Sequence, residues 1–158
     1  MTSGIFKIIM RIPVPWVFVL TYLVGLVLHF VFPFNMFSKE ASLIIRIAGV
    51  VLFATGMLLA SCCLFLFHKV RTTTTPGEKS VKLVMRGPYG VSRNPMYISL
   101  ILAYLGEAGF LTQIWPVLVL PLTLIYINYV VIPVEEDLLK KDFKEEYENY
   151  CARVHRWL

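Results

Sequence analysis

The chain has 158 residues, of which 58% are hydrophobic and 16% charged, with a formal net charge of +5 and a mean hydropathy of +0.71. Soluble domains average only about 45–50% apolar and about 25% charged residues, so this composition excludes a soluble globular domain and predicts an all-α polytopic membrane protein. Lys and Arg fall in blocks between apolar runs, so we expect no nucleic-acid partner.

Four apolar segments are long enough to cross a hydrocarbon core about 30 Å thick at about 1.5 Å per helical residue. They cover residues 14–34, 43–67, 95–111 and 114–134. The first follows basic residues, as a signal peptide does, but it lacks a small-residue cleavage pattern, and we expect a retained span. Only Thr112 and Gln113 separate the last two segments, which predicts a tight antiparallel hairpin. Gly106 and Gly109 would let its two backbones approach closely.

Basic residues are distributed unevenly about these four spans. Thirteen of the fifteen Lys and Arg residues lie in the N-terminus, in residues 68–94 and in the C-terminal tail, and only Lys39 and Arg46 lie on the other side. Positive residues favour the cytoplasmic side, so both termini and the central loop are predicted to be cytoplasmic. Anionic lipid headgroups would add to this preference.

The tail from Glu135 onward has the pattern of an amphipathic helix on the membrane surface or over the cytoplasmic ends of the spans. Its apolar residues, spaced by three or four, are Leu139, Phe143, Tyr147, Tyr150, Val154 and Trp157. Glu107 lies inside the third span, and snorkelling to the outer surface is its simpler interpretation, outside any active site. A face of the second span with Gly49 and Gly56 could pack within the chain or between two copies, so the oligomeric state stays open.

Metal-binding and disulfide patterns are missing from the sequence. Cys62 and Cys63 are adjacent in an apolar run and Cys151 is far away, while the three histidines are scattered without HExxH or CxxC spacing. We therefore predict no metal site.

The densest polar stretch is RGPYGVSRNPMYISL, residues 86–100. Pro95 suits the first turn of a helix, so Arg93-Asn94-Pro95-Met96-Tyr97 should start the third span and direct free N–H groups at the cytoplasmic interface. Such a terminus can receive an anionic group, although Asn94 and Pro95 could equally be a plain cap and helix starter.

Three consecutive acids, residues 135–137, follow the fourth span. They could compensate the helix dipole, but the hairpin would also bring them beside Arg93 and Tyr97. Tyr97 with Tyr104, and Asn128 with Glu135, are spaced by seven residues and would line a polar crevice open to the cytoplasm.

The ordered pattern LVMRGPYGVSRNPMY, a short helical hairpin and EEDLLKKDFKEEYENYCARVHRWL resembles the integral-membrane methyltransferases. These include isoprenylcysteine carboxyl methyltransferases and phospholipid methyltransferases. The resemblance covers about half of a single domain, residues 72–158, and the first two spans are similar only in being apolar. Its specific feature is the ordered combination of G-x-Y, R-x-P-x-Y, E-E and F-x-x-E-Y-x-x-Y.

The resemblance implies that residues 72–158 form an S-adenosylmethionine site between the cytoplasmic ends of the last two spans, with S-adenosylhomocysteine as product. The cofactor-contacting positions transferred by the motifs are Thr74, Val81, Lys82, Leu83, Val84, Tyr89, Asn94, Pro95, Met96, Tyr97 and Glu135. Thr74 is the weakest transfer. Isoprenylcysteine enzymes carry histidine in place of Asn94 and arginine in place of Val131, and many relatives carry arginine in place of Val134. These departures disfavour a prenylcysteine carboxylate, and Asn94 at the histidine position resembles the prokaryotic branch.

Methyl transfer from a sulfonium is an in-line displacement that needs alignment and exclusion of water rather than a catalytic triad. We expect Arg93, Tyr97, Glu135 and Glu136 to act on the reacting groups. Either glutamate, or water, could accept a proton from an amine, and Arg86 or Arg93 could hold a carboxylate or an anionic headgroup. The expected acceptor is lipophilic and embedded in the bilayer. Whether its oxygen, nitrogen or sulfur is methylated stays open.

Two other classes of protein fit parts of the sequence. Membrane sterol reductases share a related C-terminal pattern and bind NADPH, but this chain is short and lacks a basic cluster dedicated to a 2′-phosphate. In a non-enzymatic membrane protein, Asn94, Tyr97 and Glu135 would be only packing and capping residues.

Overall fold

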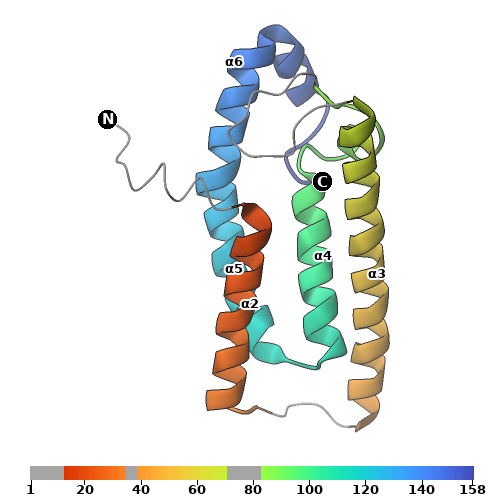
Figure 1. The fold of residues 1–158 in the computed structure, drawn as a ribbon, viewed down its shortest axis with the longest axis vertical. Coiled ribbons are helices and arrows are strands. Elements are labelled where there is room, and N and C mark those ends of the chain that lie inside the picture. Colours follow the sequence, from red (N-terminus) through yellow and green to blue (C-terminus); the bar gives the residue numbers. More distant parts are fainter. Residues whose placement is uncertain (1–12, 35–38, 71–82) are drawn as a thin grey trace, which may run out of the picture.

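The computed structural model describes residues 13–34, 39–70 and 83–158, so the predicted site residues Thr74, Val81 and Lys82 lie outside the described residues. Long helices run side by side along one axis, and the last of them continues beyond the bundle and folds back over its end (Figure 1). The described chain contains only helices and connections between them, which confirms the all-α class. The elements are α2 (Val14–Val31), α3 (Lys39–Val70), the 3₁₀ turn η1 (Gly87–Gly90), α4 (Pro95–Phe110), α5 (Ile114–Tyr126), the π turn η2 (Ile127–Val131) and α6 (Ile132–Cys151).

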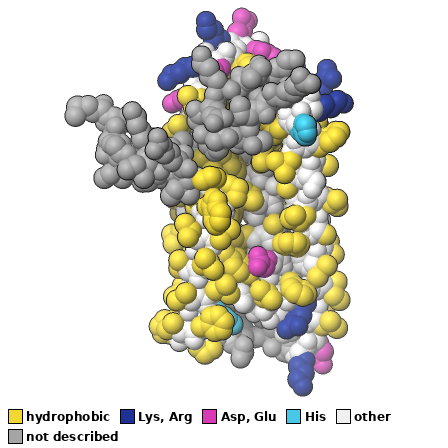
Figure 2. All heavy atoms as spheres, in the orientation of Figure 1, with side chains coloured by type: hydrophobic (Ala, Val, Ile, Leu, Met, Phe, Trp, Pro, Cys, Tyr) yellow, Lys and Arg dark blue, Asp and Glu magenta, His cyan; other side chains and the backbone are white. Residues whose placement is uncertain are grey.

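Three helical stretches are long and apolar enough to cross a membrane: Val14–Val31, Lys39–Lys69 and Ile114–Cys151. Their large hydrophobic side chains are widely exposed, and Figure 2 shows them between charged ends of the molecule. The protein is therefore an integral membrane protein. Helix α4 has 16 residues, about 24 Å at 1.5 Å per residue, so its complete crossing stays a prediction. The start of α4 lies at the same end of the bundle as the start of α2, the end of α3 and α6 (Figure 1).

The predicted boundary between the fourth span and a separate tail helix is wrong. Residues Ile114–Cys151 form a helical stretch of 38 residues with a kink at Lys144, and at about 1.5 Å per residue even the part before the kink is longer than a hydrocarbon core. Its charged part, α6, therefore continues out of the apolar bundle. Pro133 does not end the helix because η2 widens the preceding turn, where the Ile132 N–H bonds to the Ile127 carbonyl five residues back.

The close contact predicted between α4 and α5 is made instead between α4 and α3. The two glycines of α4 face Gly49 on α3, and a Cβ added to Gly106 would lie 2.4 Å from the Phe53 nitrogen. Helix α4 packs mainly on α3, while α5 packs mainly on α2 (Figure 1). Glycines on both α3 and α4 allow that closer approach, and the face with Gly49 and Gly56 is used within the chain.

The polar crevice does not extend to Tyr104, contrary to prediction. Tyr104 is buried against Phe18 and Tyr22 of α2, with ring centroids 6.1 and 5.0 Å apart, and its hydroxyl donates to the Pro116 carbonyl at 2.9 Å. Helix α2 lies close to α5, since Gly25 allows a close approach to Pro116. From this position its Phe18 and Tyr22 cover this half of α4. Only the end of α4 that carries Tyr97 can therefore belong to a site shared with α6.

Helix α6 bends at Lys144, whose φ of 46° and ψ of −120° are not helical. A non-glycine residue held there costs about 1–3 kcal/mol. Lys144→Gly should therefore raise the free energy of unfolding by about 1 kcal/mol after the added flexibility of the unfolded chain is subtracted. Thermal unfolding in detergent measures this, with Lys144→Ala as the control that keeps the strain. Equal melting temperatures for the two variants would contradict it.

The bend directs the end of α6 back over the end of the bundle (Figure 1). Of the two placements predicted for the tail, the structure therefore shows the one over the ends of the spans. Tyr147, Tyr150 and Val154 form a buried cluster against which Leu139, Phe143, Leu83 and Met85 pack. The helix ends at Cys151, but Val154 still packs with Tyr147 and Tyr150, whereas Trp157 leaves the predicted apolar stripe and packs on another cluster. Val154 and Trp157 belong to residues 152–157, a segment we call the C-terminal strap.

Candidate active site

Helix α4 is preceded by a compact turn that carries the G-x-Y motif. Gly87 has a φ of +62°, which a side chain would strain, and the Ser92 N–H bonds back to the Pro88 carbonyl at 3.1 Å. Tyr89 is buried at this turn against Phe67, with ring centroids 5.4 Å apart, and burial raises the pKa of its hydroxyl. Its carbonyl accepts a hydrogen bond of 2.7 Å from the Tyr150 hydroxyl, which connects the turn to the end of α6.

Four predicted cofactor residues line the start of α4 and its approach. Val84 and Tyr89 are buried with Cys63, and Met96 packs against them. Pro95 is fully buried as the first residue of α4, as its missing N–H and fixed φ favour. Leu83 packs instead on the aromatic cluster of α6. The structure therefore packs Val84, Tyr89 and Met96 into one buried apolar cluster at the approach to α4.

The central polar contact joins α4 to α6. Tyr97, in the first turn of α4 and buried, donates its hydroxyl hydrogen to Oε1 of Glu135 at 2.7 Å. Glu135 lies in the first turn of α6, and among the described residues its other carboxylate oxygen has no hydrogen-bond partner. The proximity expected from the sequence is observed for this pair.

The neighbouring carboxylate, Glu136, is held by two arginines. Arg156 bonds it with both oxygens engaged, Nε to Oε1 at 3.1 Å and Nη2 to Oε2 at 2.6 Å. Arg93 Nη1 lies 3.2 Å from Glu136 Oε1. The carboxylate stabilises the charged guanidinium and raises the pKa of Arg156. Glu136 therefore has its charge compensated, whereas among the described residues Glu135 bonds the Tyr97 hydroxyl alone.

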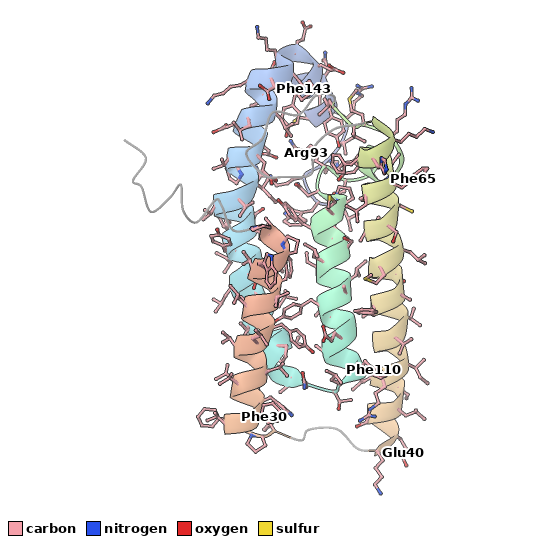
Figure 3. The ribbon with its side chains drawn as sticks, viewed as in Figure 1. Phe30, Glu40, Phe65, Arg93, Phe110 and Phe143 are labelled. Carbon is pink, nitrogen blue, oxygen red and sulfur yellow. The ribbon has the colours of Figure 1, made fainter. Side chains whose placement is uncertain are left out.

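Arg93 lies at the start of α4, beneath the returning end of α6 (Figure 3). Its Nη1 also donates to the Cys151 sulfur at 2.7 Å, and its backbone N–H donates to the His155 carbonyl at 2.9 Å. Its Nε is buried without a partner among the described residues. An unpartnered donor of this kind is suited to an anionic group of a ligand.

The C-terminal strap is tied to the start of α4 and to the π turn. The Arg156 carbonyl accepts hydrogen bonds from Asn94 Nδ2 at 2.8 Å and from Ser92 Oγ at 3.3 Å. The Trp157 indole N–H donates to Asn128 Oδ1 on η2 at 3.1 Å. Asn94 therefore holds the strap, a contact that its expected cofactor role did not anticipate.

Arg156 and Trp157 are residues of this site that the sequence did not reveal. Helical spacing placed Trp157 on an apolar stripe, and Arg156 was counted only among the basic residues that set topology. The one available signal was the pair of acids, because a buried second carboxylate needs a cation, and Arg156 is a basic residue of the same motif.

A groove of about 420 Å³ opens beside the site. Its lining combines α4, the end of α5, η2 and the strap: Ile101, Leu124, Ile125, Asn128, Tyr129 and Trp157. The lining surface is almost wholly apolar. Its one amide side chain, Asn128, accepts a hydrogen bond from Trp157. The volume lies within the range of about 300–1,000 Å³ typical of small-molecule sites.

Comparison with known proteins assigns the chain to a family. A family model described as phospholipid methyltransferase matches residues 44–146. The match starts within α3, earlier than the resemblance found in the sequence, and includes Arg93, Tyr97, Glu135 and Glu136 but not the strap. Neither the curated proteins nor the solved structures gave a match. Because the matched range is well over half of the chain, the protein belongs to the phospholipid methyltransferase family of membrane methyltransferases.

Proposed function

We propose that the protein transfers a methyl group from S-adenosylmethionine to a lipophilic acceptor at the membrane face where α4 begins. The observation that carries this proposal is the Tyr97–Glu135 hydrogen bond beside the Arg93–Glu136–Arg156 network. Membership of the family supports methyl transfer in general. S-adenosylmethionine as the cofactor is proposed from the resemblance of residues 72–158 to the family, and the cytoplasmic orientation from the distribution of Lys and Arg.

The charges of the site suit a zwitterionic cofactor. Glu135 has a carboxylate oxygen without a partner among the described residues, and it would hold the ammonium group or the ribose hydroxyls. Two arginines face the single carboxylate of Glu136, which leaves a positive surplus and the unpartnered Arg93 Nε for the carboxylate of the cofactor. Val84, Tyr89 and Met96 would form the apolar wall for the adenine.

Bound S-adenosylmethionine would supply a methyl carbon activated by a sulfonium. An acceptor lone pair held in line with this carbon would take the methyl group, and the electron pair of the broken carbon–sulfur bond would stay on sulfur. The protein's own contribution is alignment and exclusion of water. An amine acceptor must lose a proton, and Glu135 is better suited than Glu136 to accept it, because Glu136 is already engaged by two guanidinium groups.

The apolar groove supports a lipophilic acceptor. It lies between α4 and α5, and two of its lining residues, Ile125 and Tyr129, are exposed. Asn128 on its wall lies seven residues before Glu135. A hydrocarbon chain could enter it from the bilayer while its polar head stays near the acids of α6.

The first test is ligand affinity. Purified protein in nanodiscs should bind S-adenosylmethionine and S-adenosylhomocysteine saturably and should not bind NADPH. NADPH binding alone would assign a reductase, and failure of folded protein to bind any of the three would leave a non-enzymatic membrane role. Transfer of a labelled methyl group into extracted membrane lipids then identifies the class of acceptor.

A further inference from the structure

The start of α4 and the acids of α6 belong to elements that share little direct contact. Helix α4 packs mainly on α3, and α6 follows from η2 and has no comparable interface with α4. The Tyr97–Glu135 hydrogen bond therefore spans two elements whose relative position needs another support.

The C-terminal strap provides contacts on both sides of that gap. Its carbonyl groups accept from the Arg93 N–H and the Asn94 amide, both at the start of α4. The side chain of Arg156 bonds both oxygens of Glu136, directly beside Glu135. Arg156 thus bonds α4 through its backbone and α6 through its guanidinium.

A planar guanidinium that engages both carboxylate oxygens fixes an orientation as well as a distance. Glu136 is held on the helix face turned toward Arg93 and Arg156, so Glu135 is directed at Tyr97. Trp157 adds a third attachment at Asn128 of η2, where the helix is irregular. The strap therefore connects the start of α4, the first turn of α6 that carries Glu135, and η2.

We propose that Arg156 is a positioning residue: its paired hydrogen bonds to Glu136 set the alignment of Glu135 with Tyr97, and through it the affinity for the cofactor. The identity of the ligand in this proposal rests on the proposed function. The positioning of Glu135 by Arg156 rests only on the hydrogen bonds described above. Arg156 acts through Glu136 rather than by contact with the cofactor, which separates it from Arg93.

The test compares Arg156→Gln and Arg156→Lys with Arg153→Gln in nanodiscs. Arg153 is the matched control, since it lies on the same strap, is exposed, and its side chain bonds the Asn149 carbonyl and no other group among the described residues. Arg156→Gln should weaken S-adenosylhomocysteine binding about 10-fold or more. Arg156→Lys should recover part of that loss, and Arg153→Gln should bind like the natural protein. Adding Glu136→Gln to Arg156→Gln should cause little further loss, because the pair acts as a unit.

Hydrogen exchange supplies a readout that needs no ligand. The Arg93 amide, which donates to His155, should exchange faster in Arg156→Gln than in Arg153→Gln, with Arg156→Lys between them. If Arg156→Gln does not fold, Arg156→Lys tests the proposal by the same two measurements, S-adenosylhomocysteine affinity and exchange of the Arg93 amide. Equal affinity and equal exchange in the Arg156 and Arg153 variants would overturn the proposal. Natural protein that binds no S-adenosyl ligand would overturn the proposed function alone, because the exchange difference would still test the strap.

Discussion

Glu135→Gln should weaken binding of S-adenosylmethionine and S-adenosylhomocysteine by about 100-fold or more, or about 2.7 kcal/mol, while the protein stays folded. The substitution keeps the shape of the side chain, and the amide oxygen can still accept from the Tyr97 hydroxyl at the observed position. What is lost is the negative charge that would face the cationic cofactor in a partly buried site. Hydrogen bonds to charged groups contribute about 1.5–3 kcal/mol, so the loss of one charged contact accounts for most of this effect.

Asp137→Asn is the matched control for this variant, since it neutralises an exposed acid two residues further along α6. Its affinity for either ligand should change less than about 2-fold, as expected for a screened surface charge. Tyr97→Phe should fall between them, because Glu135 keeps its charge but loses its donor. Isothermal titration with S-adenosylhomocysteine measures all three variants. A folded Glu135→Gln variant with unchanged affinity would remove Glu135 from the site.

The local signals around residue 95 were sufficient to predict part of the site. A proline that suits the first helical turn placed the start of α4 correctly, and a short connection after it required α5 to return antiparallel. The acids that follow α5 were therefore expected beside Arg93 and Tyr97, where Glu136 and Glu135 are found. These inferences depended only on the order of elements along the chain.

Predictions of which helix packs against a given helix face were less successful. Glycines show that two helices come close but not which two, and those of α4 face α3 rather than α5. The stripe through Tyr104 failed for the same reason, since α2 covers it. Periodicity also continued the tail helix through Trp157, because the bend at Lys144 and the end at Cys151 carry no Gly or Pro signal. The strap contacts, which complete the polar network, followed from that unpredicted end.

Gly106→Ala should destabilise the helical bundle more than any substitution in the polar site. The added Cβ would lie 2.4 Å from the nitrogen and 2.7 Å from the Cα of Phe53, and 2.8 Å from the Gly49 carbonyl oxygen. All three are backbone atoms, so no side chain can rotate away to make room. Helices α3 and α4, which share the most extensive interface among the described elements, must therefore move apart. We expect a loss of about 3 kcal/mol and a fall of about 10 °C in melting temperature in detergent.

Gly90→Ala is the control for Gly106→Ala, because among the described residues its Cβ would meet the Met85 carbonyl oxygen alone, at 3.6 Å, an ordinary contact. Its melting temperature should stay within about 2 °C of the natural protein. Tyr97 lies nine residues before Gly106 on the same helix, so displacing α4 from α3 should also move the Tyr97 hydroxyl away from Glu135. Gly106→Ala should therefore lose ligand affinity at temperatures below its own melting transition. Unchanged melting of Gly106→Ala would mean that α3 and α4 do not meet through their glycines, and the placement of Tyr97 would then need another support.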